Sequence, residues 1–336
     1  MHSLGIIRFH HKVEQIKLVG GTEKLFPRWI KTFAMEVTPL VNDKVVFDKL
    51  GIEIKEIQFP YLITDNDNIS KIRFERALAR TKKYFHKNGV SELIVDENIG
   101  KTNELLNKEG LFRVFDGSGF YGVYIVEILK YICSNMGVKL QNLAVSLMLD
   151  DLDCFFELIL KNLCTKVRFM SIISLNSENF IPLVNEIYNE SGLVVRLEKN
   201  TKSKRGDCGI LINFSKNKDF VNSNRFSRNF IVLNLGADIL NKNQNGIIIT
   251  NIKMKSKNKD ICKHSWIGNP GFAEALAYMS LGIEMRDSAI LLQRQKKVIS
   301  AFKTAGYYID GVKGCRGDIE KEVLAEFGKR LNTKIV

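Results

Sequence analysis

The chain has 336 residues, of which 45% are hydrophobic and 26% are charged. This composition is typical of a soluble globular protein, and it excludes a disordered chain, a collagen-like fibre and a small disulfide-stapled protein. At about 100–200 residues per domain, the length predicts two domains.

The chain is basic, with 50 Lys+Arg against 37 Asp+Glu and a net charge of +13. Such an excess attracts polyanions. Two segments, 199–205 and 253–263, hold more than their share of lysine, and we expect both to be loops. Neither contains an aromatic residue on which a base could stack, and no helix-turn-helix or zinc-finger spacing accompanies them. Solvated loops are therefore the first interpretation, and a nucleic-acid surface is the less favoured alternative.

The cysteine pattern and the absence of long apolar runs indicate a reduced, cytoplasmic protein. The six cysteines form no C-x-x-C pair, so the spacing of a zinc site is missing. The N-terminal residues lack the apolar segment of a signal peptide, and no run of about 18 apolar residues predicts a membrane span. We therefore expect no membrane partner.

In the first part of the chain, strand-like and helix-like segments alternate, which favours an α/β fold. Short apolar runs typical of strands occur at 45–47, 52–57, 93–95 and 111–115. The spacing of Phe74, Leu78 and Phe85 predicts a helix, and residues 101–109 predict a second. A wide apolar face after Gly117 predicts a largely buried helix that ends near Met136.

The pattern is clearest between residues 138 and 252. Strand-like apolar runs occur at 143–149, 166–174, 193–197, 209–213, 230–234 and 246–250. Such runs, alternating with helices, are typical of a parallel sheet covered on both faces. We therefore predict a Rossmann-like domain at 138–252, preceded by an N-terminal α/β lobe at 1–120 and a connecting helix at 121–137. Residues 253–336 are expected to be helical and to pack back on the N-terminal lobe.

A first candidate ligand-binding segment is Gly117-Ser118-Gly119-Phe120-Tyr121-Gly122, which matches G-x-G-x-x-G between a strand and a helix. In dinucleotide-binding proteins such glycines bring helix-terminal amides close to a pyrophosphate. The acid that normally confirms the motif lies about 20 residues further on. Here the next acid at a strand end is Asp150, at 150 − 117 = 33 residues. A structural turn and a binding loop formed by Gly117, Ser118, Gly119 and Gly122 both stay open.

A second candidate is the turn Asp150-Asp151-Leu152-Asp153, which follows the apolar run at 143–149. The order of elements around it resembles that of two-domain Rossmann proteins of the shikimate dehydrogenase and glutamyl-tRNA reductase type. That resemblance implies a glycine-rich cofactor loop at the place where this chain has three carboxylates. Carboxylates cap a helix well, but they repel a pyrophosphate, so NAD(P) is not expected there in the usual way. Asn213 and Asn234, at the ends of later strands, are further candidate ligand-binding residues.

The same turn also resembles the D-x-D segment of haloacid dehalogenase-type phosphotransferases. In that family the first Asp is a nucleophile and Mg²⁺ ligand, and the second is a general acid/base. Asp150, Asp151 and Asp153 are therefore candidate metal ligands, with helix capping as the structural alternative. The sequence offers no acidic pair at a later strand end to complete such a site.

These observations leave functions of two classes open. One is a divergent relative of NAD(P)-dependent oxidoreductases that has lost the usual cofactor loop and acts as a small-molecule-binding or regulatory protein, with its ligand in a cleft between domains. The other is an enzyme: an oxidoreductase with an atypical cofactor site, or a Mg²⁺-dependent phosphotransferase or phosphatase that uses Asp151 and Asp153. No catalytic residue is assigned.

Overall fold

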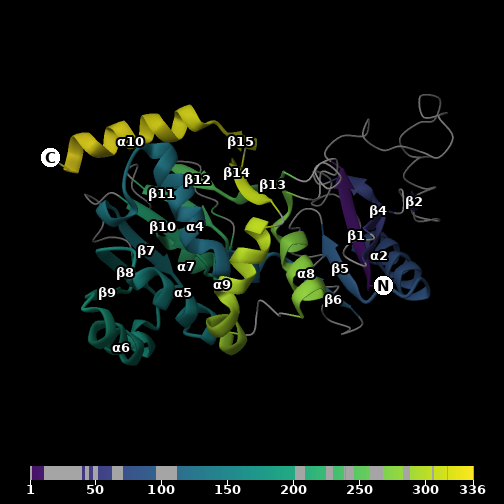
Figure 1. Cartoon of the computed structure of the whole chain (residues 1–336), viewed down its shortest axis with the longest axis horizontal. Coiled ribbons are helices and arrows are strands. Elements are labelled where there is room, and N and C mark those ends of the chain that lie inside the picture. Colours follow the sequence, from purple (N-terminus) through teal and green to yellow (C-terminus); the bar gives the residue numbers. More distant parts are fainter. Residues whose placement is uncertain are drawn as a thin grey trace. The chain divides into compact units, whose positions relative to one another are not determined.

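The protein is described from a computed structural model (Figure 1). The structure describes the following residues of the chain: 2–10, 40–41, 45–47, 52–62, 71–95, 112–200, 209–224, 230–237, 239, 246–257, 268–282, 288–304, 306–315 and 317–335. The chain divides into two compact units. The first comprises residues 1–117 and 271–283, and the second comprises residues 118–270 and 284–336. The helix expected at 101–109 lies outside the described residues.

The first unit contains a six-stranded sheet with the order β2-β4-β1-β5-β6, in which β3 also pairs with β4. Its strands are β1 (His2–His10), β2 (Leu40–Val41), β3 (Val45–Phe47), β4 (Ile52–Leu62), β5 (Glu92–Val95) and β6 (Arg113–Phe115). Strands β4, β1, β5 and β6 are parallel, whereas β2 and β3 run antiparallel to β4. Parallel strands require crossover connections, and α2 (Lys71–Lys87) lies in the connection from β4 to β5, the two strands on either side of β1.

Two helices complete the described part of the first unit. The apolar face of α2 packs on the sheet through Leu78 and Phe85, in a buried cluster that includes Ile7 and Leu93. Helix α8 (Pro270–Leu281) joins this unit although it comes late in the chain. The ring of its Tyr278 lies 5.6 Å from that of Phe115, measured between centroids, and the guanidinium of Arg113 lies over it.

The second unit is built on a six-stranded parallel sheet with the order β12-β11-β10-β7-β8-β9. Its strands are β7 (Ala144–Met148), β8 (Phe169–Ile173), β9 (Val195–Glu198), β10 (Gly209–Asn213), β11 (Phe230–Asn234) and β12 (Ile247–Ile249). Counted along the chain, the spatial order is 3-2-1-4-5-6, which is that of Rossmann dinucleotide-binding domains. The predicted α/β, Rossmann-like fold class is confirmed. In this topology the strand order reverses between β7 and β10, and ligands of such sheets bind at the carboxyl ends of the strands at this point.

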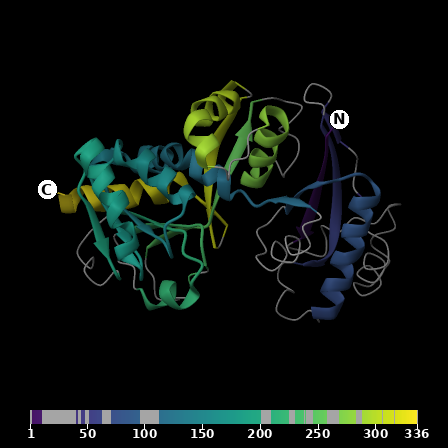
Figure 2. The same cartoon turned by 90° about the horizontal axis from the view of Figure 1, so that it is seen from below.

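Helices cover both faces of this sheet (Figure 2). Helix α7 (Lys218–Ser223) packs through Phe220 and Val221 on the face that carries Met148, Leu211 and Val232. Helices α4 (Ser118–Met136) and α5 (Cys154–Cys164) contact each other on the opposite face, and α6 (Ile181–Ser191) packs beside α5.

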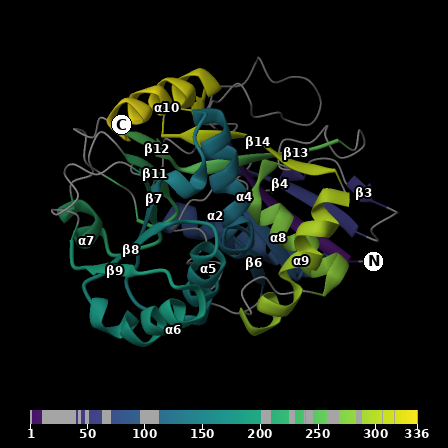
Figure 3. The same cartoon turned by 60° about the vertical axis from the view of Figure 1, so that its left-hand side comes forward.

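A smaller antiparallel sheet and two further helices belong to the same unit (Figure 3). The sheet has the order β13-β14-β15, with β13 (Asn251–Ser256), β14 (Tyr307–Gly314) and β15 (Gly317–Ile319). Helix α9 (Ser288–Thr304) contacts α4, α5 and β14, and α10 (Lys321–Ile335) packs on α4.

The C-terminal segment differs from the helical one expected at 253–336. Residues 251–256 form a strand rather than part of a lysine-rich loop, and β14 and β15 lie between α9 and α10. Only α8 joins the first unit, while α9 and α10 join the second. The reason is the apolar face of α4, which needs cover along its length and receives it from both α9 and α10. Helix α4 also begins at Ser118, so the glycine segment is mostly its first turn.

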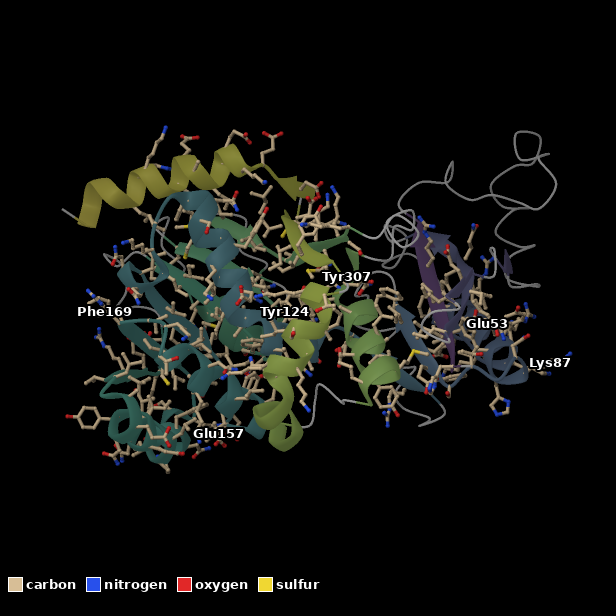
Figure 4. The ribbon with its side chains drawn as sticks, viewed as in Figure 1. Glu53, Lys87, Tyr124, Glu157, Phe169 and Tyr307 are labelled. Atoms are coloured by element: carbon tan, nitrogen blue, oxygen red, sulfur yellow. The ribbon has the colours of Figure 1, made fainter. Side chains whose placement is uncertain are left out.

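An aromatic cluster joins α4, α9 and β14 inside the second unit. Phe302 contacts the rings of both Tyr124 and Tyr307, at centroid distances of 5.7 and 5.6 Å. Figure 4 labels the two tyrosines. Both tyrosines are buried, and neither hydroxyl has a hydrogen-bond partner among the described residues. Burial raises the pKa of both phenols. By contrast, Tyr121 on the same helix donates its hydroxyl to Asn251 Oδ1 at 2.8 Å.

None of the helices in the described residues is long and apolar enough to cross a membrane.

These tyrosines allow a matched test of the packing. Tyr124→Phe removes a buried hydroxyl that has lost its water without gaining a partner, so it should raise the free energy of unfolding by about 1 kcal/mol. Tyr121→Phe removes a hydroxyl that is hydrogen-bonded, and it should lower the free energy by about the same amount. Urea unfolding of the two variants beside the parent protein measures both effects. Equal losses in the two variants would show that the Tyr124 hydroxyl is satisfied in solution.

Candidate functional site

The backbone amide at the start of the glycine segment already has an internal acceptor. Gly117 adopts a left-handed conformation with φ 83°, which favours glycine because no Cβ is present. Its N–H donates to Glu274 Oε2 at 2.9 Å. Glu274 comes from α8 and is only 2% exposed. An anion that sought this amide would have to displace a buried carboxylate of the protein itself.

The last glycine of the segment is required for helix packing. A Cβ on Gly122 would lie 2.2 Å from Cε2 of Phe155, far inside contact distance. Gly119 and Gly122 are both buried within α4. Gly122 therefore lets α4 pass close to α5, which gives this glycine a structural reason.

In the acidic turn, Asp150 bridges the two strands at which the sheet order reverses. It follows β7, and its carboxylate accepts a hydrogen bond from the hydroxyl of Ser215. It also accepts the N–H of Lys216 at 2.7 Å. Both partners lie just after β10, the neighbour of β7 in the sheet. The backbone carbonyl of Asp150 accepts the hydroxyl of Ser174 at 3.1 Å, so the turn is tied to the end of β8 as well.

The other two carboxylates of the turn are exposed and have separate local partners. Asp153 is the N-cap of α5 and accepts the N–H of Phe156 at 2.8 Å. Asp151 Oδ1 accepts the side-chain amide of Asn179 at 3.0 Å and the N–H of Leu152 at 2.8 Å. These hydrogen bonds, chiefly that from Asn179, lower the pKa of Asp151 because they favour its charged form.

Asn213 and Asn234 lie side by side at the ends of β10 and β11 and are both buried. Asn213 Nδ2 donates to Asn234 Oδ1 at 2.6 Å, and Asn213 Oδ1 accepts the N–H of Ser215 at 3.1 Å. The pair therefore holds together the carboxyl ends of two strands and the loop that carries Ser215. These contacts use most of the hydrogen-bonding capacity of the Asn213 side chain.

The structure thus joins Asp150, Ser215, Asn213 and Asn234 into one polar network at the carboxyl edge of the parallel sheet. Within the described part of the chain, no three His, Cys, Asp or Glu side chains form a group that could hold a metal ion. Ser215, Ser174, Asn179 and Glu274 were not predicted from the sequence. Ser174 ends the strand-like run at 166–174 and Ser215 lies two residues after the run at 209–213, so the rule that selected Asn213 could have found them. Glu274 is a single acid in an apolar helix and gives no such signal.

No protein family model matches the chain, and no curated protein matches it. Among solved structures, it is similar to shikimate dehydrogenase in complex with NADP⁺ at 13% identity and a TM-score of 0.33, over 89% of this chain and 95% of the other. It is similar to quinate dehydrogenase from Corynebacterium glutamicum in complex with NAD at 10% identity and a TM-score of 0.32, over 89% and 99%. It is also similar to ornithine carbamoyltransferase from Pyrococcus furiosus at 12% identity and a TM-score of 0.29, over 84% and 85%.

The resemblance expected from the order of elements is confirmed in that shikimate and quinate dehydrogenases are among the similar structures. Likenesses this distant carry no conclusion about what the chain binds or does.

The hydrogen bond between Asp150 and Ser215 predicts that substitutions at these two positions have non-additive effects on stability. Asp150→Ala removes the acceptor of two hydrogen bonds and should lower the free energy of unfolding by about 1.5–3 kcal/mol. Ser215→Ala should cost less, and the double variant should cost clearly less than the sum of the two, because both remove the same contact. Strict additivity in urea unfolding would contradict the bridge. Asp151→Ala combined with Ser215→Ala serves as the control, and its two effects should add because Asp151 is hydrogen-bonded to Asn179 and Leu152 instead.

The hydrogen bond to Asp151 predicts a change in its titration. Asn179→Ala should raise the pKa of Asp151 toward the ordinary value of 3.8, because the carboxylate loses its main stabilising donor. A pH titration of the side-chain carboxyl carbon by NMR measures this shift. Asn185→Ala, an exposed Asn of α6, should leave the titration unchanged. An unchanged pKa in Asn179→Ala would show that the side-chain contact is not formed in solution.

Proposed function

We propose that the chain is a Rossmann-like protein without the usual dinucleotide cofactor, and that it acts as a small-molecule-binding or regulatory protein. The observation that carries the proposal is the Asp150 carboxylate, which lies between β7 and β10 and is hydrogen-bonded to Ser215 and Lys216. In Rossmann domains the pyrophosphate of the cofactor lies at this point. Here a negative charge of the protein occupies the corresponding edge of the sheet.

The backbone donors near this point support the same proposal. A pyrophosphate is normally bound by N–H groups of the loop and of the helix start. In this chain the N–H groups of Leu152, Phe156 and Lys216 each donate to a carboxylate of the acidic turn. The residues present therefore do not fit an NAD(P) cofactor bound in the usual way.

Charge repulsion adds to the loss of donors. Two like unit charges about 4 Å apart repel by roughly 4 kcal/mol at an effective dielectric constant of about 20. A neutral hydrogen bond contributes only about 1 kcal/mol net. Three carboxylates facing a doubly charged pyrophosphate would thus outweigh the few contacts that the turn could still provide.

The surroundings of the turn favour an apolar ligand without a strongly anionic group. Phe155, Phe156 and Phe214 form a half-buried trio, with ring centroids 5.3–6.2 Å apart. Phe155 and Phe156 follow Asp153 after one intervening residue, and Phe214 directly precedes Ser215, so aromatic residues lie next to the carboxylates in the chain. A ligand that is neutral or positively charged would meet complementary chemistry at this edge.

Calorimetric titration tests the proposal. NAD and NADP should produce no binding heat with the parent protein in the absence of metal. Changing Asp150, Asp151 and Asp153 together to Asn should allow weak binding, since the change removes three negative charges and leaves the side-chain size almost unaltered. Metal-free micromolar binding of NAD or NADP by the parent protein, abolished by Asp151→Arg but not by Gly119→Val, would overturn the proposal in favour of an oxidoreductase with an atypical cofactor site.

The phosphotransferase alternative is tested separately. A Mg²⁺-dependent enzyme that uses Asp151 and Asp153 should hydrolyse p-nitrophenyl phosphate, and it should lose this activity in Asp151→Asn. We expect no hydrolysis above background, because Asp151 and Asp153 are committed to Asn179, Leu152 and Phe156. Mg²⁺-dependent turnover that requires Asp151 would replace the proposal by this enzyme class.

A further inference from the structure

The outer face of the β13-β14-β15 sheet gathers basic side chains by strand alternation. Along β13, Ile252, Met254 and Ser256 are buried. Side chains of a strand alternate between its two sides. The other side is therefore lined by Lys253 and Lys255, and by Lys257 directly after the strand. Two residues of a strand span about 6.6 Å, so the three lysines leave the backbone at about this interval along one side of β13 and the residue after it. Lys313 of β14 lies beside the start of this row, since it pairs with Asn251.

The same face carries an exposed aromatic ring that comes from a different part of the chain. Tyr308 of β14 pairs with Lys255 in the antiparallel register, and it is 41% exposed. The lysine-rich segment alone contains no aromatic residue, which was the reason to interpret it as a solvated loop. The strand pairing supplies the missing ring and places it in the middle of the lysine row.

Two carboxylates accompany the lysines without neutralising the face. Lys255 Nζ lies 2.8 Å from Asp310 Oδ2, and Lys253 Nζ lies 2.5 Å from Asp318 Oδ2. Ion pairs at such exposed positions contribute little stability, so an incoming anion can replace the carboxylates at small cost. Lys257 and Lys313 have no such acidic partner among the described residues, which leaves the face with four lysines against two acids.

We infer that this face, defined by Lys253, Lys255, Lys257, Lys313 and Tyr308, is a binding surface for single-stranded nucleic acid. The lysine row matches a backbone of regularly spaced phosphates, and the exposed ring offers a stacking surface for one base. A single strand is favoured over a duplex because only an unpaired base can stack on a protein ring. The net charge of +13 assists the approach of such a polyanion. The inference is independent of the function proposed for the acidic turn.

Fluorescence anisotropy with a labelled single strand of about 12 nucleotides tests the inference on the full chain. Tyr308→Ala should weaken binding by roughly 5- to 150-fold, the range for loss of one stacked base. Tyr308→Trp should retain binding, because it keeps an aromatic ring. Tyr188→Ala removes a comparably exposed ring from α6 and should have no effect. Thermal unfolding of each variant checks that the fold is kept.

Substitutions of the lysines and of the acids on this face should change the affinity in opposite directions. Each of Lys253→Ala, Lys255→Ala, Lys257→Ala and Lys313→Ala should weaken binding and reduce the slope of log affinity against log salt by about 0.7. Lys296→Ala and Lys329→Ala, at exposed positions of α9 and α10, should leave both unchanged. Asp310→Asn and Asp318→Asn should tighten binding, because each releases a lysine and removes a negative charge from the face.

Four outcomes would overturn the inference. They are the absence of binding at low salt, binding that Tyr308→Ala leaves unchanged, equal losses in the patch and control lysine variants, and an affinity for poly-glutamate or anionic lipid vesicles equal to that for the oligonucleotide. The last two would indicate a diffuse electrostatic attraction rather than this site.

Discussion

The constraint on which both units depend is that backbone N–H groups at strand ends and helix starts must find acceptors. In a dinucleotide-binding protein a cofactor phosphate fills part of this role. Here the protein's own carboxylates fill it: Glu274 for Gly117, Asp150 for Lys216, Asp153 for Phe156. These three N–H groups are therefore already hydrogen-bonded within the chain.

Much of the second unit could be predicted from sequence because its strands are long apolar runs separated by helices. The six runs between residues 143 and 250 all became strands of one parallel sheet. The antiparallel sheet was missed for the opposite reason. Lys253 and Lys255 alternate with buried residues in a segment whose charge suggested a loop, and β14 mixes tyrosine, glycine and charged residues. The two strands pair with each other, and neither has the apolar run that would predict a strand from its own sequence.

For the candidate site, the sequence could locate the acidic turn but not its partners. Asp150 and Ser215 are 65 residues apart in the chain, and they meet because β7 and β10 are neighbours in the sheet. That neighbourhood follows from strand order, which apolar runs do not specify. The glycine segment illustrates the same point. Its spacing suited a phosphate loop, yet the residue that explains Gly122 is Phe155, a side chain from the following helix.

The second unit carries negative side chains at the acidic turn and positive side chains on the β13-β14-β15 sheet. Carboxylates lie where the parallel sheet and α5 present amide donors, and the lysines lie along β13, an edge strand of the antiparallel sheet. Asp150 and Asp153 thus accept from backbone N–H groups, whereas Lys253 and Lys255 pair with carboxylates of β15 and β14. The two proposals therefore assign a polyanion to the lysine face and a neutral or positively charged ligand to the strand-end turn, so they can be tested independently on one chain.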